Sequence, residues 1–194
     1  MIKLNLLTAF VLMTLCSPLL FSQSEERMIH VSVSAGHIFN KNEFHKYWTP
    51  SIGVGGEFSF DHSIGKIGAG LSLMRFDKKI NSAKSFYGVD YNFLYRSYVN
   101  VIHDLNFVLG FDAGIFEFRF DDDNDIRGTA EQVEREFAIK LVSGFSYALG
   151  NTWNAEVTTA YNHIYTRKKI ELFYIKFGVA KSFSSPEWLK EFLD

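Results

Sequence analysis

The sequence has little of several features that mark common protein classes. Its single cysteine, Cys16, lies in an N-terminal segment that we expect to be removed, so the mature chain has neither disulfides nor thiol chemistry. The 20 basic and 22 acidic residues nearly cancel, which excludes the positive field that a nucleic-acid-binding protein needs. No apolar run of about 18 residues follows Ser24, so we expect no transmembrane helix after that point.

Spacings typical of metal and catalytic sites are missing as well. No two of the six histidines stand two or four residues apart, where one strand or one helix would bring two metal ligands together. Asp121, Asp123 and Asp125 begin like a calcium loop, but Ile126 replaces its glycine and Gln132 replaces its final glutamate. The glycine clusters lie inside alternating segments, so none of them forms a phosphate-binding loop. We therefore expect no metal site, no cofactor and no catalytic residue.

Aromatic residues and glycine are abundant instead, with 20 Phe, 9 Tyr and 14 Gly. In residues 106–120, NFVLGFDAGIFEFRF, large apolar side chains alternate with small or polar ones. A period of two is that of a β-strand with two unlike faces. The apolar face carries Phe107, Leu109, Phe111 and Ile115, and the other face carries Asn106, Gly110, Asp112 and Gly114. The direction in which Asp112 points therefore decides whether the apolar face meets a core or lipid.

Eight alternating segments follow one another along the chain, at 28–39, 51–61, 66–76, 85–100, 104–120, 136–149, 152–165 and 169–183. Each reaches the roughly 9–11 residues that a tilted strand needs to cross a bilayer. The connections at 61–65, 100–104 and 149–152 are short, while those at 40–50, 77–84 and 121–135 are longer, with 166–168 as an exception. Short turns at one end and longer loops at the other are typical of membrane barrels, and a soluble barrel does not require them.

The distribution of side chains over the two faces favours the membrane barrel. The face opposite the large apolar residues is small, polar or charged, so charged residues share it with glycines. A soluble ligand-binding barrel shows the reverse, with bulky apolar residues inside and charges outside. We therefore predict an all-β protein, an eight-stranded antiparallel up-and-down transmembrane β-barrel with a short C-terminal helix. The even strand number puts both chain ends at the short-turn end.

The predicted lumen contains a nearly balanced set of charges. Four residues are acidic, Glu57, Asp90, Asp112 and Glu156, and three are basic, Arg96, Lys140 and Lys176. Pairing removes much of the cost of burying such groups, so we expect ion pairs between neighbouring strands. The two interpretations are a salt-bridged plug and a selective or gated pore. Eight strands enclose too little room for an open aqueous channel, which favours the plug.

The last predicted strand contains a short motif, KFGVAKSF. Lys176, Gly178 and Phe183 in it match the polar–x–Gly–x–x–apolar–x–aromatic assembly signal of bacterial outer-membrane barrels, and Lys181 departs from the apolar position. With this motif and the strand pattern of 28–183, the chain resembles the small eight-stranded outer-membrane barrels of the OmpA/OmpX type. The resemblance implies insertion by the barrel assembly machinery of a Gram-negative bacterium. It also implies contact with outer-membrane lipid and lipopolysaccharide.

The two ends of the chain have compositions of their own. Residues 1–24 read as a signal peptide, with Lys3, an apolar run, and Ser22 and Ser24 before a cleavage site; a membrane anchor is the alternative. Residues 25–183 form the predicted barrel. Residues 184–194 form a short periplasmic amphipathic tail, in which Pro186 fits the first turn of a helix. Its apolar face consists of Trp188, Leu189, Phe192 and Leu193. This face rests on the bilayer, plugs the periplasmic mouth of the barrel or docks a partner.

These observations predict a non-enzymatic structural or interaction component of the cell envelope, an accessory subunit of a larger outer-membrane complex. Its partners would be other outer-membrane or periplasmic proteins, with no nucleic acid among them. The alternatives are a lipid A-acting barrel enzyme and a narrow, porin-like pore. Such an enzyme needs a His and a Ser together near the outer rim. His37 and His163 have the right height, but the last predicted strand separates them, and Tyr165 stands where a serine is needed.

Overall fold

The computed structural model describes residues 28–40, 43–62, 65–121, 133–166 and 170–186. One four-residue helix, α2 (Phe44–Tyr47), lies between β1 and β2. Within these ranges, no helix is long and apolar enough to cross a membrane. Nearly all other described residues lie in β1 (Met28–Asn40), β2 (Trp48–Pro50), β3 (Gly53–His62), β4 (Gly65–Lys78), β5 (Phe86–Ile102), β6 (Leu105–Phe120), β7 (Val133–Ala148), β8 (Trp153–Ile164) and β9 (Ile170–Ser184).

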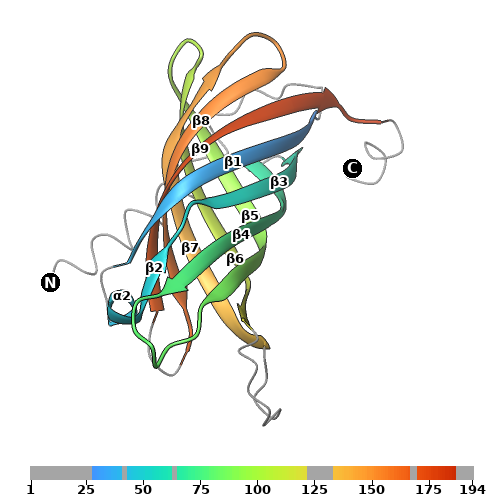
Figure 1. Cartoon of the computed structure of the whole chain (residues 1–194). Helices are drawn as coiled ribbons and strands as arrows, with labels where there is room; N and C mark the ends of the chain where they lie inside the picture. The colour runs from blue at the N-terminus through green and yellow to red at the C-terminus, as the bar shows by residue number, and fades with distance from the viewer. Residues whose placement is uncertain (1–27, 41–42, 63–64, 122–132, 167–169, 187–194) are drawn as a thin grey trace, which may run out of the picture.

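The eight long strands close into a barrel (Figure 1). Their order is β4-β3-β1-β9-β8-β7-β6-β5, each antiparallel to its neighbours, and β5 pairs with β4 to complete the ring. The hydrogen-bond register, followed once round the barrel from His30, returns to β1 at Asn40, ten residues further along. A stagger of this size tilts the strands by about 40° and leaves a narrow interior. The predicted eight-stranded antiparallel barrel is therefore confirmed, while the residues of the predicted C-terminal helix, 187–194, lie outside the described residues.

The eight predicted strands are all present, but two of the predicted loops need correction. The loop predicted for 121–135 ends earlier, because β7 begins at Val133 and Arg135 lies opposite Glu117 on β6. The loop predicted for 40–50 contains α2 and β2, and β2 pairs with β4. In both places, regular structure lies beyond the point where the alternation of apolar and polar side chains ends.

The short connections and the longer ones lie at opposite ends of the barrel (Figure 1). In the β7–β8 turn, Gly150 has a φ of 101°, a conformation that favours glycine. In the β5–β6 turn, His103 has a φ of 41°, and Asn100 Nδ2 donates to its carbonyl oxygen at 2.7 Å. We call the end of the barrel that carries these two turns the short-turn end. The long-loop end carries α2, β2 and the connections after β4 and β6.

The two faces of each long strand have different environments. On β6, Phe111 and Ile115 point outward and are 39% and 48% exposed, whereas Asp112 points inward and is 2% exposed. Phe107 and Leu109 lie on the same outward face and are half-buried. Large apolar side chains are exposed in the same way on the other long strands. So much exposed apolar surface is rare on a soluble monomer, whereas lipid covers it in a membrane-spanning barrel.

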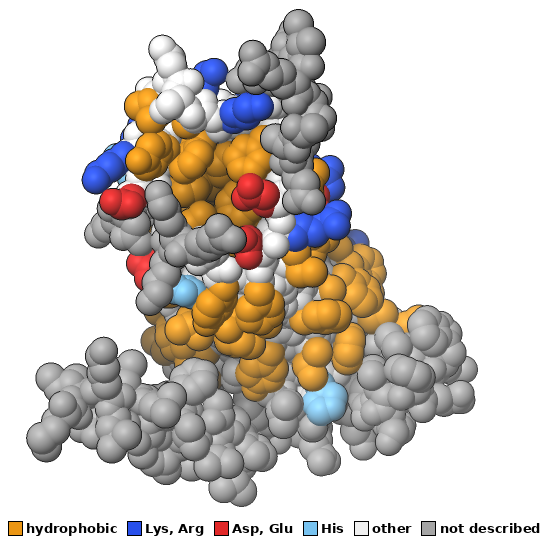
Figure 2. Space-filling view, turned by 90° about the horizontal axis from the view of Figure 1, so that it is seen from below, with side chains coloured by type: hydrophobic (Ala, Val, Ile, Leu, Met, Phe, Trp, Pro, Cys, Tyr) orange, Lys and Arg blue, Asp and Glu red, His pale blue; other side chains and the backbone are white. Residues whose placement is uncertain are grey.

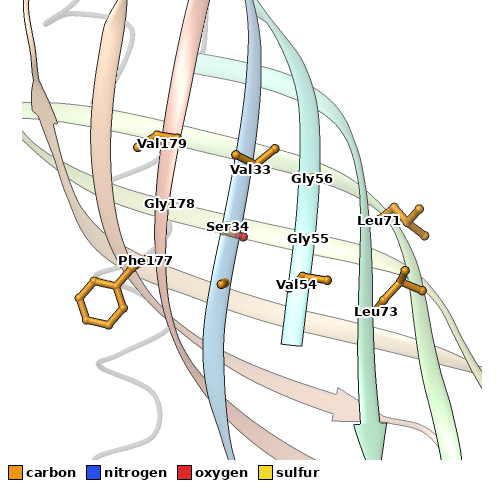
Figure 3. A pocket seen from close by; sticks show the side chains of 11 residues that line it. Val33, Ser34, Val54, Gly55, Gly56, Leu71, Leu73, Phe177, Gly178 and Val179 are labelled. Carbon is orange, nitrogen blue, oxygen red and sulfur yellow. The ribbon is translucent and has the colours of Figure 1, made fainter. Parts of the chain in front are cut away.

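The outward face is also loosely shaped. A shallow groove of about 660 Å³ crosses β9, β1, β3 and β4 (Figure 3), and small residues such as Ala35 and Gly56 are among those that line it. The larger lining residues are Val33, Val54, Leu71, Leu73, Phe177 and Val179. Lipid chains fill an irregular surface of this kind, whereas a packed protein core leaves few voids. The groove therefore belongs to the lipid-facing wall.

Glycines on the inward face allow the close approach of neighbouring strands. A Cβ atom on Gly114 would overlap the carbonyl oxygen of Tyr91, and one on Gly68 would overlap that of Phe58. These positions alternate with outward apolar residues on β6 and β4. Glycine at such sites lets a small barrel curve strongly. The shared face of glycines and charges thus reflects the narrow interior.

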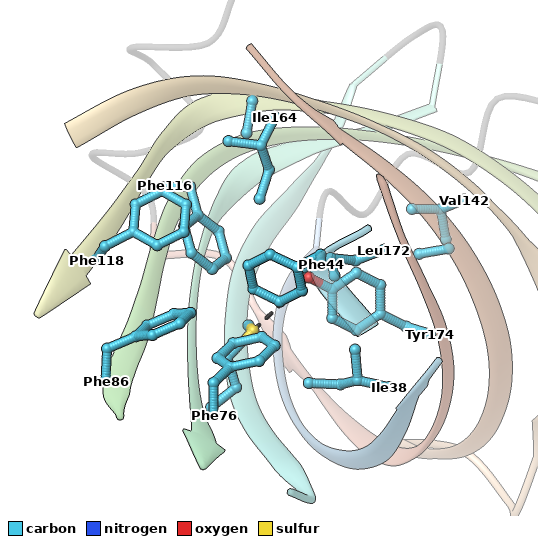
Figure 4. Close-up of a cluster of buried hydrophobic side chains, with 13 residues drawn as sticks. Ile38, Phe44, Phe76, Phe86, Phe116, Phe118, Val142, Ile164, Leu172 and Tyr174 are labelled. Carbon is cyan, nitrogen blue, oxygen red and sulfur yellow. Dashed lines mark hydrogen bonds between the residues drawn. The ribbon is translucent and has the colours of Figure 1, made fainter. Parts of the chain in front are cut away.

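The lumen near the long-loop end is apolar and aromatic, which the sequence pattern did not indicate (Figure 4). Phe76 and Phe86 stack with ring centroids 4.7 Å apart, and Phe116 and Phe118 pack beside them. Phe44 enters from α2 and contacts the ring of Phe76 at 5.4 Å. Trp48 lies over the cluster and donates from Nε1 to the carbonyl oxygen of Lys84 at 2.7 Å. This layer, which we call the aromatic layer, fills that half of the barrel.

Candidate functional site

The other half of the lumen contains a network of buried ion pairs. Lys140 on β7 lies 2.5 Å from a carboxylate oxygen of Asp90 on β5 and 3.7 Å from one of Asp112 on β6. Arg96 on β5 donates to both oxygens of Asp112 and lies 3.2 Å from Glu57 on β3. The side chains of Asp90, Asp112 and Lys140 are at most 3% exposed. Each buried charge here has an opposite charge beside it, which offsets its desolvation.

The remaining predicted lumen residues border this network. Glu156 accepts a hydrogen bond from the Tyr98 hydroxyl at 3.3 Å. Lys176 lies between two small cavities: one of about 20 Å³ is also lined by Glu57, Arg96 and Glu156, and one of about 10 Å³ is also lined by Tyr174. A water molecule needs roughly 10–15 Å³, so each of these spaces has room for about one water. The arrangement is a filled interior at this level of the barrel.

A second polar cluster lies at the short-turn end and was missed in the sequence. One ring nitrogen of His30, Nε2, lies 2.9 Å from Asp61 Oδ1, and the other, Nδ1, lies 2.8 Å from Ser182 Oγ. Lys66 Nζ is 3.3 Å from the same Nδ1, and its ammonium also lies over the Tyr98 ring at 4.3 Å. Every one of these positions falls on the inward face by alternation. That alternation is the signal that could have found them.

Ser182, His30 and Asp61 form a hydrogen-bonded chain of the types found in hydrolases, yet its surroundings do not support catalysis. Ser182 is only 7% exposed. Its backbone amide donates to the carbonyl oxygen of Thr152 at 2.8 Å, so this amide cannot donate to an oxyanion. The ammonium of Lys66 competes with the hydroxyl for Nδ1 of His30. The cluster instead ties β1, β3, β4 and β9 together where the chain enters and leaves the barrel.

The histidines predicted for a lipid-facing enzyme do not meet. His37 on β1 and His163 on β8 have β9 between them, as the sequence indicated. The ring of His163 contacts that of Tyr165, and its Nδ1 lies 3.7 Å from Glu171. The ring of His37 packs against Phe39. Within the described residues, no group of three or more His, Cys, Asp or Glu side chains could hold a metal ion.

The long-loop end carries a second set of charges, on the outward side of the wall and in the loops (Figure 2). Seen from this end, apolar side chains gather in the mouth with basic and acidic side chains beside them. Arg75 on β4 donates from its two Nη atoms to the two carboxylate oxygens of Asp121, at 2.6 and 2.5 Å. Its Nε donates to a carboxylate oxygen of Asp77. Its guanidinium lies over the Tyr87 ring at 4.4 Å. The pair joins the ends of β4 and β6.

This pair makes the titration of Asp121 a direct test of its geometry. The hydrogen bonds from Arg75 hold the pKa of Asp121 below its usual value of about 3.9. Because that pKa is lowered, the stabilisation from the pair is complete above the ordinary value and is lost as the pH falls through the lowered one. We expect a carbon-detected NMR titration to place the midpoint of Asp121 below about 3.9 in the native protein, and Arg75→Gln to raise it. An unchanged midpoint in Arg75→Gln would show that the pair does not persist in solution.

The assembly-signal residues occupy different environments in β9. Lys176 and Gly178 face the lumen, and Gly178 adjoins Val33 and Ser34 on β1 so closely that a Cβ would crowd them. Phe183 faces outward and is 44% exposed, with the Lys181 ammonium 5.2 Å from its ring. The predicted tail residues Trp188, Leu189, Phe192 and Leu193 lie outside the described residues, as do residues 1–24, Asp123 and Asp125. Their roles stay predictions.

The comparisons with known proteins concern the fold. No protein-family model matches the sequence, and no curated protein matches it. The structure is similar to that of Neisserial surface protein A (NspA), with a TM-score of 0.51 at 12% identity, over 81% of this chain and 97% of that one. The N-terminal β-barrel domain of Pseudomonas aeruginosa OprF gives 0.49 at 12% identity over 80% and 97%. Ail of Yersinia pestis, bound to the heparin analogue sucrose octasulfate, gives 0.48 at 10% identity over 81% and 98%. By its likeness to NspA, the chain has the fold of the small eight-stranded membrane barrels.

Proposed function

We propose that this chain is a non-enzymatic structural or interaction component of the bacterial outer membrane. The observation that carries the proposal is the double filling of the lumen, by the ion pairs around Asp112 and Lys140 and by the aromatic layer around Phe76 and Phe86. A barrel filled in this way has no open channel, so its interactions take place at its wall, its loops and its two ends. No observation favours the pore, and the separation of His37 from His163 by β9 disfavours the lipid A-acting enzyme.

In the finer form of this proposal, the chain is an accessory subunit of a larger outer-membrane complex. The signal peptide at 1–24 directs export, and the barrel assembly machinery recognises Lys176, Gly178 and Phe183 during insertion. The long-loop end faces outward and the short-turn end faces the periplasm, as short turns do in such barrels. In this proposal the tail at 184–194, which follows β9 at the short-turn end, contacts a periplasmic or membrane partner.

Copurification from the native outer membrane tests this proposal. We expect a tagged chain, solubilised in mild detergent, to retain a defined partner in fixed ratio. The double substitution Trp188→Ser/Phe192→Ser should release that partner while the barrel still migrates as folded on a gel. The control, Phe173→Ser, alters one exposed aromatic residue on the lipid-facing wall and should leave the partner bound. A chain that fractionates with the outer membrane alone, without any partner, would overturn the subunit role.

A further inference from the structure

We propose that the long-loop rim of β6 and β7 binds the phosphate of an anionic lipid head group between Arg119 and Arg135. The inference rests on the proposed function, which places this rim in the outer leaflet. It deepens that function by naming a lipid partner and the side chains that hold it. The ligand chemistry is a phosphate with free oxygens, and the lipid is the source that we favour.

The two arginines lie on the wall rather than in a loop. The register places Ile115 on β6 opposite Phe137 on β7, and both are outward and about half exposed, at 48% and 51%. The next outward positions towards the long-loop end are Glu117 opposite Arg135, and then Arg119. The change from apolar to charged side chains thus takes place within one step of the strand. Head groups meet a membrane barrel at this boundary, where its apolar band ends.

The charge of this cluster is unbalanced in favour of the arginines. Glu117 is shared, because Arg119 bonds its Oε1 from Nε and Arg135 bonds its Oε2 from Nε at 2.7 Å. Its side chain is only 4% exposed, whereas those of Arg119 and Arg135 are 53% and 68% exposed. One buried carboxylate therefore holds two guanidinium groups side by side, and these three side chains together carry a charge of about +1. Each arginine uses Nε towards Glu117, so the terminal Nη groups of an exposed side chain remain accessible.

Neighbouring charges around the rim show why the ligand would bind here. Arg75, in the same cross-strand row as Tyr87 and Arg119, has carboxylates on all of its nitrogens, from Asp77 and Asp121. On the strands that follow β7 in the ring, His163 of β8 lies beside Glu171 of β9. The Tyr91 hydroxyl lies 3.4 Å from Nη2 of Arg119, which adds a polar group at the edge of the pair. Of these charged groups, Arg119 and Arg135 combine net positive charge with high exposure.

The chemistry of the pair suits phosphate. A guanidinium is planar and always charged, and it offers two parallel N–H groups that match two phosphate oxygens. Two such groups, positioned by a shared carboxylate, can contact one tetrahedral phosphate from adjacent strands about 5 Å apart. The position beside the apolar band lowers the local dielectric and strengthens the attraction relative to water. An anionic head group anchored by its own chains therefore meets both requirements at once.

Lipid retention in native mass spectrometry tests the inference. The purified chain is placed in phosphatidylcholine nanodiscs containing a minor fraction of phosphatidic acid, whose head group is a phosphate monoester. We expect the native chain to retain phosphatidic acid several-fold above its share of the bilayer. Arg119→Gln/Arg135→Gln should reduce this enrichment to the bulk ratio. The double variant leaves Glu117 without a cation partner among these side chains. The single substitution Arg135→Gln keeps the ion pair of Arg119 with Glu117, and it should lose part of the enrichment.

The controls separate a specific site from general charge and from free phosphate. Lys79→Gln/Lys84→Gln removes the same charge from the same end of the barrel, but in the loop after β4, and should keep the enrichment. An equal loss in this control, or equal retention in every variant, would overturn the site. If inorganic phosphate displaces phosphatidic acid when the two are equimolar, the lipid assignment is wrong. A failed enrichment in a chain that still fractionates with the outer membrane and its partner would refute this inference and leave the proposed function standing.

Discussion

Replacement of Lys140 by methionine should destabilise the barrel by about 3–5 kcal/mol, because it removes one partner of a buried ion pair. Lys140 is the cation 2.5 Å from Asp90, and both side chains are at most 3% exposed. Asp112 keeps Arg96 as a partner in this variant, but Asp90 loses the cation with which it forms its ion pair. The free energy of unfolding, from reversible urea titration in lipid vesicles followed by tryptophan fluorescence, measures the effect.

Two further variants distinguish charge pairing from simple loss of a side chain. Lys140→Met/Asp90→Leu removes both charges, and replacing a whole buried pair by apolar residues is often close to neutral. We therefore expect the double variant to regain most of the stability that Lys140→Met loses. Lys181→Met removes an outward lysine whose ammonium lies 5.1 Å from the Trp153 ring, and it should cost about 1 kcal/mol or less. If Lys140→Met loses no more free energy of unfolding than Lys181→Met does, the ion pair of Lys140 with Asp90 contributes little to stability.

The network illustrates how far alternation alone leads. The period of two predicts that the side chains of Asp112 and Lys140 point inward. The order of β6 and β7 in the sequence predicts that the two residues lie on adjacent strands. The contact of Lys140 with Asp90 does not follow, because β6 lies between β5 and β7, and the side chains reach across the lumen. The pair of Arg96 and Glu57 likewise spans β4. Such contacts depend on the stagger and on the barrel radius, which no local pattern encodes.

The aromatic layer and the rim show a different limit. Phe76 and Phe86 lie near strand ends, where the alternation merges with the loops and does not indicate their inward direction. Phe44 reaches the lumen from α2, in a segment whose polar neighbours indicate only a loop. The charge of Arg135 predicts a loop, because charge usually ends a membrane strand. Each of these positions needed the register of its strand, which only the closed barrel provides.

The Phe86→Ala substitution should cost about 3–5 kcal/mol, because it opens a cavity in the aromatic layer that the surrounding rings cannot close. Phe86 is 1% exposed, and its ring contacts those of Phe44, Phe76, Trp48, Phe118 and Phe120. These partners come from α2, β4, β2 and β6, so the cavity would lie where the first outer segment docks onto the barrel. The same urea titration gives the free energy of unfolding.

A phenylalanine on the opposite face of the same strand is the matched control. Phe93 on β5 points outward and is 77% exposed, so in a bilayer it contacts lipid rather than protein. Phe93→Ala loses only the transfer of a ring from water to an apolar medium, about 2 kcal/mol, and leaves no cavity because lipid fills the space. The excess cost of Phe86→Ala therefore measures packing inside the lumen. Equal losses in the two variants would mean that water or lipid already enters this half of the barrel, and the filled lumen on which the proposed function rests would then be wrong.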